Sequence, residues 1–106
     1  VLGVAYKQDI DDYRESPALR VIDKLKSVGA CVDYYDPWIP ECKYKGSVLT
    51  SISELTTQAV QNADLVMITC AHSNVDYTMV QRNAKVIFDT KNVMKDIIPR
   101  DNIEVL

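Results

Sequence analysis

The stretch SPALRVIDKLKSVGA, residues 16–30, decides the fold because it is the clearest helix in the chain. Ser16 suits an N-cap and Pro17 the first helical position, and Gly29 suits the C′ position. Apolar residues recur through the stretch at helical spacing, which predicts one face packed on a core. These residues are Ala18, Val21, Ile22, Leu25 and Val28.

Strand-like segments lie on both sides of this helix. Residues 1–6, VLGVAY, form a short apolar run typical of a strand buried on both faces. Residues 31–36, CVDYYD, alternate in polarity and end at the turn signal Asp36-Pro37. The first third of the chain therefore predicts a strand, a helix and a second strand.

The rest of the chain continues this alternation. Ser51 and Glu54 have capping-box spacing and predict a helix through Ala63. A short helix is expected at 75–83, strands at 64–70, 85–90 and 103–106, and an irregular connection at 37–50. Apolar strands alternating with amphipathic helices predict an α/β fold. We expect a Rossmann-like three-layer sandwich, with a mostly parallel sheet of about five strands flanked by helices.

Length and charge limit the classes of function. The 106 residues suit one domain, and a net charge of −3 argues against nucleic-acid and membrane-surface binding. No long apolar run or signal-peptide pattern occurs. Three cysteines without a C-x-x-C pair fit reduced thiols in a cytoplasmic protein. Because Val1 already lies inside an apolar run, we expect residues 1–106 to be one domain of a longer protein.

Cations follow two of the predicted strands at one sheet edge. Ligands of open α/β sheets bind beyond the carboxyl ends of the strands, where Lys7 and Lys91 leave the sheet. Two lysines converging there would hold an anionic group. Arg14 either pairs with neighbouring acids or presents its planar fork to phosphate or carboxylate. The alternative for Lys7 is a solvated side chain paired with one of the three acids Asp9, Asp11 and Asp12.

A dinucleotide-binding turn is missing from the first loop. The pattern G-x-G-x-x-G would let a pyrophosphate approach a helix N-terminus, but only Gly3 occurs here. Asp36 could mimic the acid that holds a ribose, although a turn-forming aspartate before Pro37 is the simpler explanation.

Three motifs together resemble a known family. GVAYKQDIDDYRESPAL (3–19), GACVDYYDPWIP (29–40) and VIFDTKN (86–92) are similar to the carboxy-terminal domain of the UDP-glucose/GDP-mannose dehydrogenase family. The family pattern is Gly-x-x-Phe/Tyr-Lys, an acidic stretch, Arg-Glu-Ser-Pro, Tyr-Asp-Pro, and a late Asp-x-Arg/Lys. The motifs occur in order and span nearly the whole chain.

The resemblance implies that three domains have different roles in the full enzyme. An amino-terminal domain binds NAD, a central helical domain dimerises and carries the catalytic cysteine, and this third domain binds the UDP-sugar. The enzymes oxidise the sugar C6 alcohol to a carboxylate in two steps with two NAD. Residues 1–106 hold no match to the catalytic cysteine, so alone they are expected to be inactive. The full enzyme is expected to be a homo-oligomer supplying surface polysaccharide synthesis.

Site residues are carried over by position. Tyr6 and Lys7 match the aromatic-lysine pair that contacts the nucleotide sugar, and Arg14 matches an arginine that reaches NAD across the domain boundary. Lys91 matches a substrate-contacting position that is often arginine, so the charge is kept but the bidentate geometry is lost. The motifs RESPAL and YYDPWIP are more similar to the branch acting on UDP-N-acetyl-hexosamines than to the UDP-glucose branch.

Other polar residues leave alternatives open. Cys31 and Cys70 are expected in the core and Cys42 in a more exposed loop. His72 either contacts the uracil side of the ligand or is structural, and a lone histidine without spaced partners predicts no metal site. The alternative function is a stand-alone nucleotide-binding module without catalytic activity.

Overall fold

A computed structural model describes residues 1–106. Its regular elements are α1 (Pro17–Ser27), β1 (Glu41–Tyr44), β2 (Ser47–Thr50), α2 (Thr57–Asn62), β3 (Val66–Ile68), α3 (Tyr77–Asn83), β4 (Ile87–Asp89) and β5 (Ile103–Val105). The strands β3, β4 and β5 form a parallel sheet in that order, as the alternating pattern predicts. The α/β class is therefore confirmed. No helix has the length and apolar character that a membrane crossing requires.

The prediction of one sheet of about five strands is not confirmed. The strands divide into the parallel sheet and a separate antiparallel pair, β1 and β2. Residues 1–6 and 31–36, expected as strands, make only isolated parallel bridges. Leu2 of the first segment pairs with Ile68 of β3 on one side and with Tyr35 of the second segment on the other. Gly3 has φ +90°, far from the extended backbone of a parallel strand, so the first segment cannot continue the ladder.

The hairpin β1–β2 replaces the irregular connection expected at 37–50. Tyr44 pairs with Ser47, which leaves Lys45 and Gly46 as a two-residue turn. Both have positive φ, 49° and 78°, as the tight turns that suit twisted hairpins require. The expectation of irregular structure was wrong because the Lys45-Gly46 turn signal lies between two short alternating runs.

Two helix starts show opposite outcomes. Ser16 caps α1 as predicted, its side chain accepting from Ala18 N, and Pro17 is the first helical residue. The predicted capping box at Ser51 is wrong, since α2 begins at Thr57 with Thr56 as its N-cap. The hydroxyl of Ser51 instead accepts from Asp36 N, a long-range partner that competes with helix capping.

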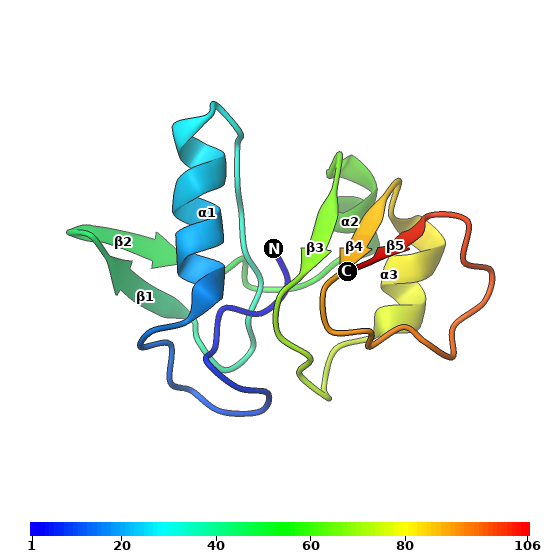
Figure 1. Ribbon diagram of the computed structural model, residues 1–106, viewed down its shortest axis with the longest axis horizontal. Coiled ribbons are helices and arrows are strands. Elements are labelled where there is room, and N and C mark those ends of the chain that lie inside the picture. Colours follow the sequence, from blue (N-terminus) through cyan, green and yellow to red (C-terminus); the bar gives the residue numbers. More distant parts are fainter.

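The core consists of two clusters on either side of the first segment. Helix α1 and the hairpin contribute to one cluster, while α2 and α3 pack on β3 and β4 in the other. Figure 1 shows this arrangement, with α1 and β1–β2 on one side of the amino-terminal segment and the parallel sheet on the other. Residue Leu2 belongs to the sheet cluster, whereas Val4 and Ala5 belong to the α1 cluster. The first segment therefore joins the two halves, and the loop that follows it starts at their boundary.

Candidate functional site

Asp36 organises the edge where the first two segments end. Its carboxylate is buried and accepts from Val4 N and Ala5 N at 2.8 and 3.1 Å, and from Trp38 N at 2.8 Å. The bond from Trp38 is the turn expected at Asp36-Pro37. The other two bonds satisfy backbone groups that leave the sheet at this edge. Asp36 is thus a structural acceptor and is not free to hold a ribose.

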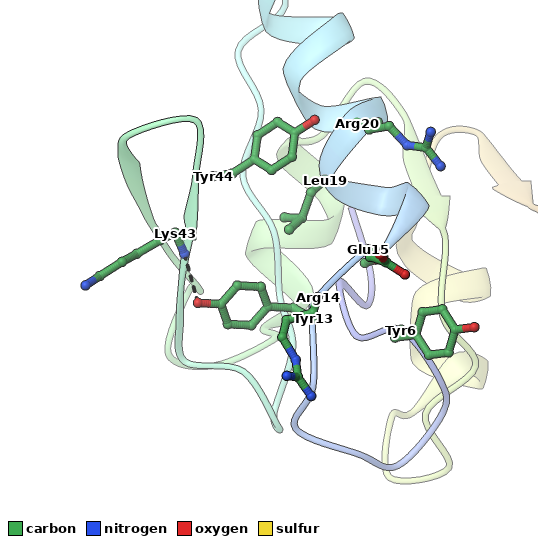
Figure 2. A pocket seen from close by; sticks show the side chains of 9 residues that line it. Tyr6, Tyr13, Arg14, Glu15, Leu19, Arg20, Lys43 and Tyr44 are labelled. Carbon is green, nitrogen blue, oxygen red and sulfur yellow. Dashed lines mark hydrogen bonds between the residues drawn. The ribbon is translucent and has the colours of Figure 1, made fainter.

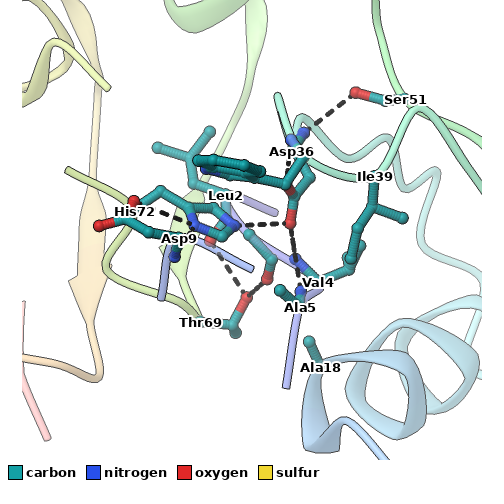
Figure 3. A network of polar contacts seen from close by, with 12 residues as sticks. Leu2, Val4, Ala5, Asp9, Ala18, Asp36, Ile39, Ser51, Thr69 and His72 are labelled. Atoms are coloured by element: carbon teal, nitrogen blue, oxygen red, sulfur yellow. Dashed lines mark hydrogen bonds and ion pairs between the residues drawn. The ribbon is translucent and has the colours of Figure 1, made fainter. Parts of the chain in front are cut away.

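His72 lies against Asp36 and is almost fully buried, at 1% exposure. Its Nε2 is 2.9 Å from Asp36 Oδ2, and its Nδ1 accepts from Asp9 N at 2.8 Å. Figure 3 shows the imidazole between the two aspartates. Both ring nitrogens are occupied, so His72 is structural and does not offer a nitrogen to the uracil side of a ligand.

Asp9 ties the first loop to the loop after β3. Its carboxylate accepts from Ser73 N at 2.9 Å and from Ser73 Oγ at 2.8 Å. These bonds, the backbone one first, lower the pKa of Asp9. Neither this role of Asp9 nor the contribution of Ser73 follows from the sequence. Because Asp9 and Ser73 are 64 residues apart, their spacing carries no signal of this contact.

Asp89 accepts hydrogen bonds from the turn after β4, as Asp36 does from the turn after the second segment. It is buried and accepts from Lys91 N and Val93 N, each at 3.1 Å, and from Met94 N at 2.8 Å. A turn therefore begins immediately after β4. The Lys91 side chain is exposed from this turn.

The two predicted phosphate-binding lysines have no acidic partner. Lys7 is exposed and makes no ion pair with Asp9, Asp11 or Asp12. Burial raises the pKa of Cys70 to about 11; the charge of Asp36 raises it as well, and that of Lys91 lowers it. Both lysines belong to loops tied by buried aspartates.

Arg14 is paired, unlike the lysines. Its Nε and NH2 groups donate to the two carboxylate oxygens of Asp12 at 3.0 and 2.9 Å. Hydrogen bonds from this guanidinium lower the pKa of Asp12 to about 2. Because both groups are exposed, we interpret the pair as an aid to the orientation of Arg14 and not as a source of stability.

Tyr6 and Arg14 line one surface cavity of about 630 Å³ between α1 and the hairpin. Tyr13, Leu19 and Tyr44 also border it, as Figure 2 shows. The ring of Tyr6 is 58% exposed and free to contact a ligand. Neither Lys7 nor Lys91 lines this cavity, although Lys7 directly follows Tyr6 in the chain.

The cysteines differ from expectation at two positions. Cys70 is buried as predicted, but Cys31 is exposed and Cys42 is buried, the reverse of the prediction. Cys42 lies on β1, and its side chain packs under α1 in the core cluster. Burial also raises the pKa of the Cys42 thiol, so neither buried cysteine is a reactive nucleophile.

Comparison with known proteins places these features in a family. The family model for the UDP-glucose/GDP-mannose dehydrogenase family, UDP binding domain, matches residues 1–96. A UDP-N-acetyl-D-mannosamine dehydrogenase of Methanocaldococcus jannaschii is 36% identical over 102 residues, 89% of this chain. This chain spans 22% of the length of that relative.

Two solved structures share the fold. The UDP-N-acetyl-mannosamine dehydrogenase Cap5O from S. aureus superposes with a TM-score of 0.73 at 32% identity, over 98% of this chain and 24% of that one. A UDP-D-ManNAc dehydrogenase from Pyrococcus horikoshii gives 0.74 at 26% identity, with the same coverage of 98% and 24%. The similarity therefore extends over nearly the whole chain and about a quarter of each dehydrogenase.

Proposed function

Because this chain belongs to the UDP-glucose/GDP-mannose dehydrogenase family, we propose that residues 1–106 are the UDP-binding domain of a longer NAD-dependent UDP-sugar 6-dehydrogenase. That enzyme oxidises the sugar C6 alcohol to a carboxylate. The task of this domain is to hold the nucleotide, so that the sugar extends toward catalytic groups on another domain.

Two unpaired lysines on loops at the carboxyl edge of the sheet are the observation that carries this proposal. A diphosphate brings negative charges that Lys7 and Lys91 can neutralise without first breaking an ion pair. The loops are already held by Asp36, Asp9 and Asp89, so little ordering is needed when the ligand binds. Tyr6, which precedes Lys7 in the chain and is exposed, supplies an aromatic face to the nucleoside.

NAD does not fit as a cofactor held by this chain alone. The first loop lacks the glycines that let a pyrophosphate approach the backbone. The one glycine of this segment, Gly3, is packed against Cys70, since a Cβ at Gly3 would lie 2.5 Å from Cys70 Cβ. We therefore propose that another domain holds NAD. Arg14 reaches it across the domain boundary, oriented by Asp12.

We also propose a UDP-N-acetyl-hexosamine as the sugar substrate. The similar proteins named above are UDP-N-acetyl-mannosamine dehydrogenases, which supports this choice over UDP-glucose. The enzyme is proposed to be a cytoplasmic homo-oligomer that supplies surface polysaccharide synthesis. Assaying NAD reduction by the complete enzyme with a panel of UDP-sugars tests the substrate.

Titration calorimetry of UDP binding to the complete dehydrogenase tests the role of the lysines. We expect Lys7→Ala to raise the Kd for UDP about tenfold or more, because a charge-assisted contact to phosphate is lost. Lys91→Ala is expected to act in the same direction.

Lys24→Ala is the matched control. Lys24 is an exposed lysine in the last turn of α1, and its loss changes the net charge equally. UDP affinity that falls equally in Lys24→Ala and Lys7→Ala would show a general charge effect. Undiminished affinity in Lys7→Ala would overturn the assigned role.

A further inference from the structure

His72 is a buried titratable group to which the proposed function gives no role. It lies where the loops after the first segment, the second segment and β3 meet. Three polar neighbours surround it, since Tyr77 on α3 also donates its hydroxyl to the His72 carbonyl at 2.7 Å. The ring of Trp38 lies 6.5 Å away, centroid to centroid. Through these contacts of its ring and its carbonyl, His72 connects the elements around it.

The hydrogen bonds identify one tautomer. A backbone N–H can only donate, so the bond from Asp9 N requires an unprotonated Nδ1. The proton of the neutral ring is then on Nε2, where it donates to Asp36 Oδ2. His72 therefore acts as an acceptor toward the first loop and as a donor toward the second segment.

The bond to Asp9 lies two residues from Lys7. Asp9 has φ 59°, a left-handed conformation that is uncommon for a non-glycine residue and is kept only when surroundings determine it. His72 holds the Asp9 backbone, and the neighbouring Ser73 holds its carboxylate. The 71–73 segment therefore anchors the loop that carries Lys7.

We propose that His72 is a positioning residue for UDP binding, because its neutral ring fixes the Asp9 backbone and thereby places Lys7 at the sheet edge. This inference rests on the proposed function, in which Lys7 contacts the diphosphate. His72 itself touches no ligand, since both of its nitrogens are occupied within the protein.

Two substitutions separate positioning from simple stability. His72→Leu removes both the donor and the acceptor, whereas His72→Gln keeps an amide oxygen for Asp9 N and an amide N–H for Asp36. In the complete dehydrogenase at pH 8, we expect His72→Leu to raise the Kd for UDP about tenfold. His72→Gln is expected to stay close to wild type, and thermal melts establish that each variant is folded.

The outcomes distinguish the two proposals. A folded His72→Leu with wild-type affinity, while Lys7→Ala has lost affinity, overturns the role of His72 and leaves the UDP site intact. Undiminished affinity in Lys7→Ala overturns the proposed contact itself. His72→Gln binding as weakly as His72→Leu overturns the assignment to a donor and acceptor pair.

Discussion

At the scale of single residues, the candidate site depends on two buried aspartates that bind backbone N–H groups. Asp36 and Asp89 each accept bonds from the turn that follows them, and Asp36 also accepts from the first segment. Their carboxylates replace the regular ladder at the edge of the sheet. The exposed lysines are placed by these buried acids, not by ion pairs of their own.

The Asp36 carboxylate is expected to be among the most costly side chains to remove. Asp36→Ala leaves Val4 N, Ala5 N and the His72 ring without their acceptor, so we expect a loss of about 3 kcal/mol in the free energy of unfolding. Urea denaturation measures this loss. In Asp33→Ala, an exposed aspartate three residues earlier, the change should stay within about 0.5 kcal/mol. Equal losses in the two variants would contradict the role of Asp36.

At the scale of elements, the first segment lies in the middle of the molecule although it is not a regular strand. Leu2 bridges both to Tyr35 and to Ile68, so the segment keeps its neighbours in parallel register. Gly3 then departs from extended geometry and lets the chain pass against Cys70. The route to Lys7 is therefore determined by a glycine within the segment, not by a glycine turn after it.

A comparison of two glycines with similar φ values distinguishes the cost of backbone strain from the cost of a steric clash. Gly3 and Gly29 have φ values of +90° and +96°, but a Cβ at Gly29 meets nothing within 4 Å, whereas one at Gly3 lies 2.8 Å from the Cys70 carbonyl oxygen. We expect Gly29→Ala to cost about 1–2 kcal/mol from backbone strain alone. Gly3→Ala should cost about 3 kcal/mol more, because packed backbone must move.

Chemical denaturation of both glycine variants measures the difference. A slope that stays constant between them shows that the same unfolding reaction is compared. If Gly3→Ala proved no less stable than Gly29→Ala, the close approach of the first segment to Cys70 would be wrong.

At the scale of the whole molecule, thiol accessibility reports the packing of both halves. Cys31 is exposed, Cys42 is buried against α1, and Cys70 is buried where the halves meet. We expect a thiol reagent to label one cysteine quickly in the folded chain and all three after unfolding. In Cys31→Ser, fast labelling should disappear. Fast labelling of more than one thiol in the native protein would contradict the arrangement of the hairpin and α1.

Much of the architecture could be predicted because its signals are local. The Ser16-Pro17 start of α1, the turn at Asp36 and the parallel strands after Ala63 follow from spacing and residue type over a few positions. The pairing of Arg14 with Asp12 is equally local, two residues apart, and was among the open alternatives. The family resemblance likewise depends on short motifs in a fixed order.

Other features depend on contacts between distant residues. His72 forms hydrogen bonds with Asp36 and Asp9, which are 36 and 63 residues away in the chain. Ser51, predicted to cap a helix, instead accepts a hydrogen bond from Asp36 N, 15 residues away. The spacing of residues along the sequence does not predict such contacts, because only folding brings these groups within hydrogen-bonding distance. The sequence by itself determined the α/β class, the Ser16 cap of α1, the parallel strands after Ala63 and the candidate lysines. The tertiary structure alone decided which acids are buried, which cysteine is exposed and that Lys7 is unpaired, since burial and hydrogen bonding are properties of the packed chain.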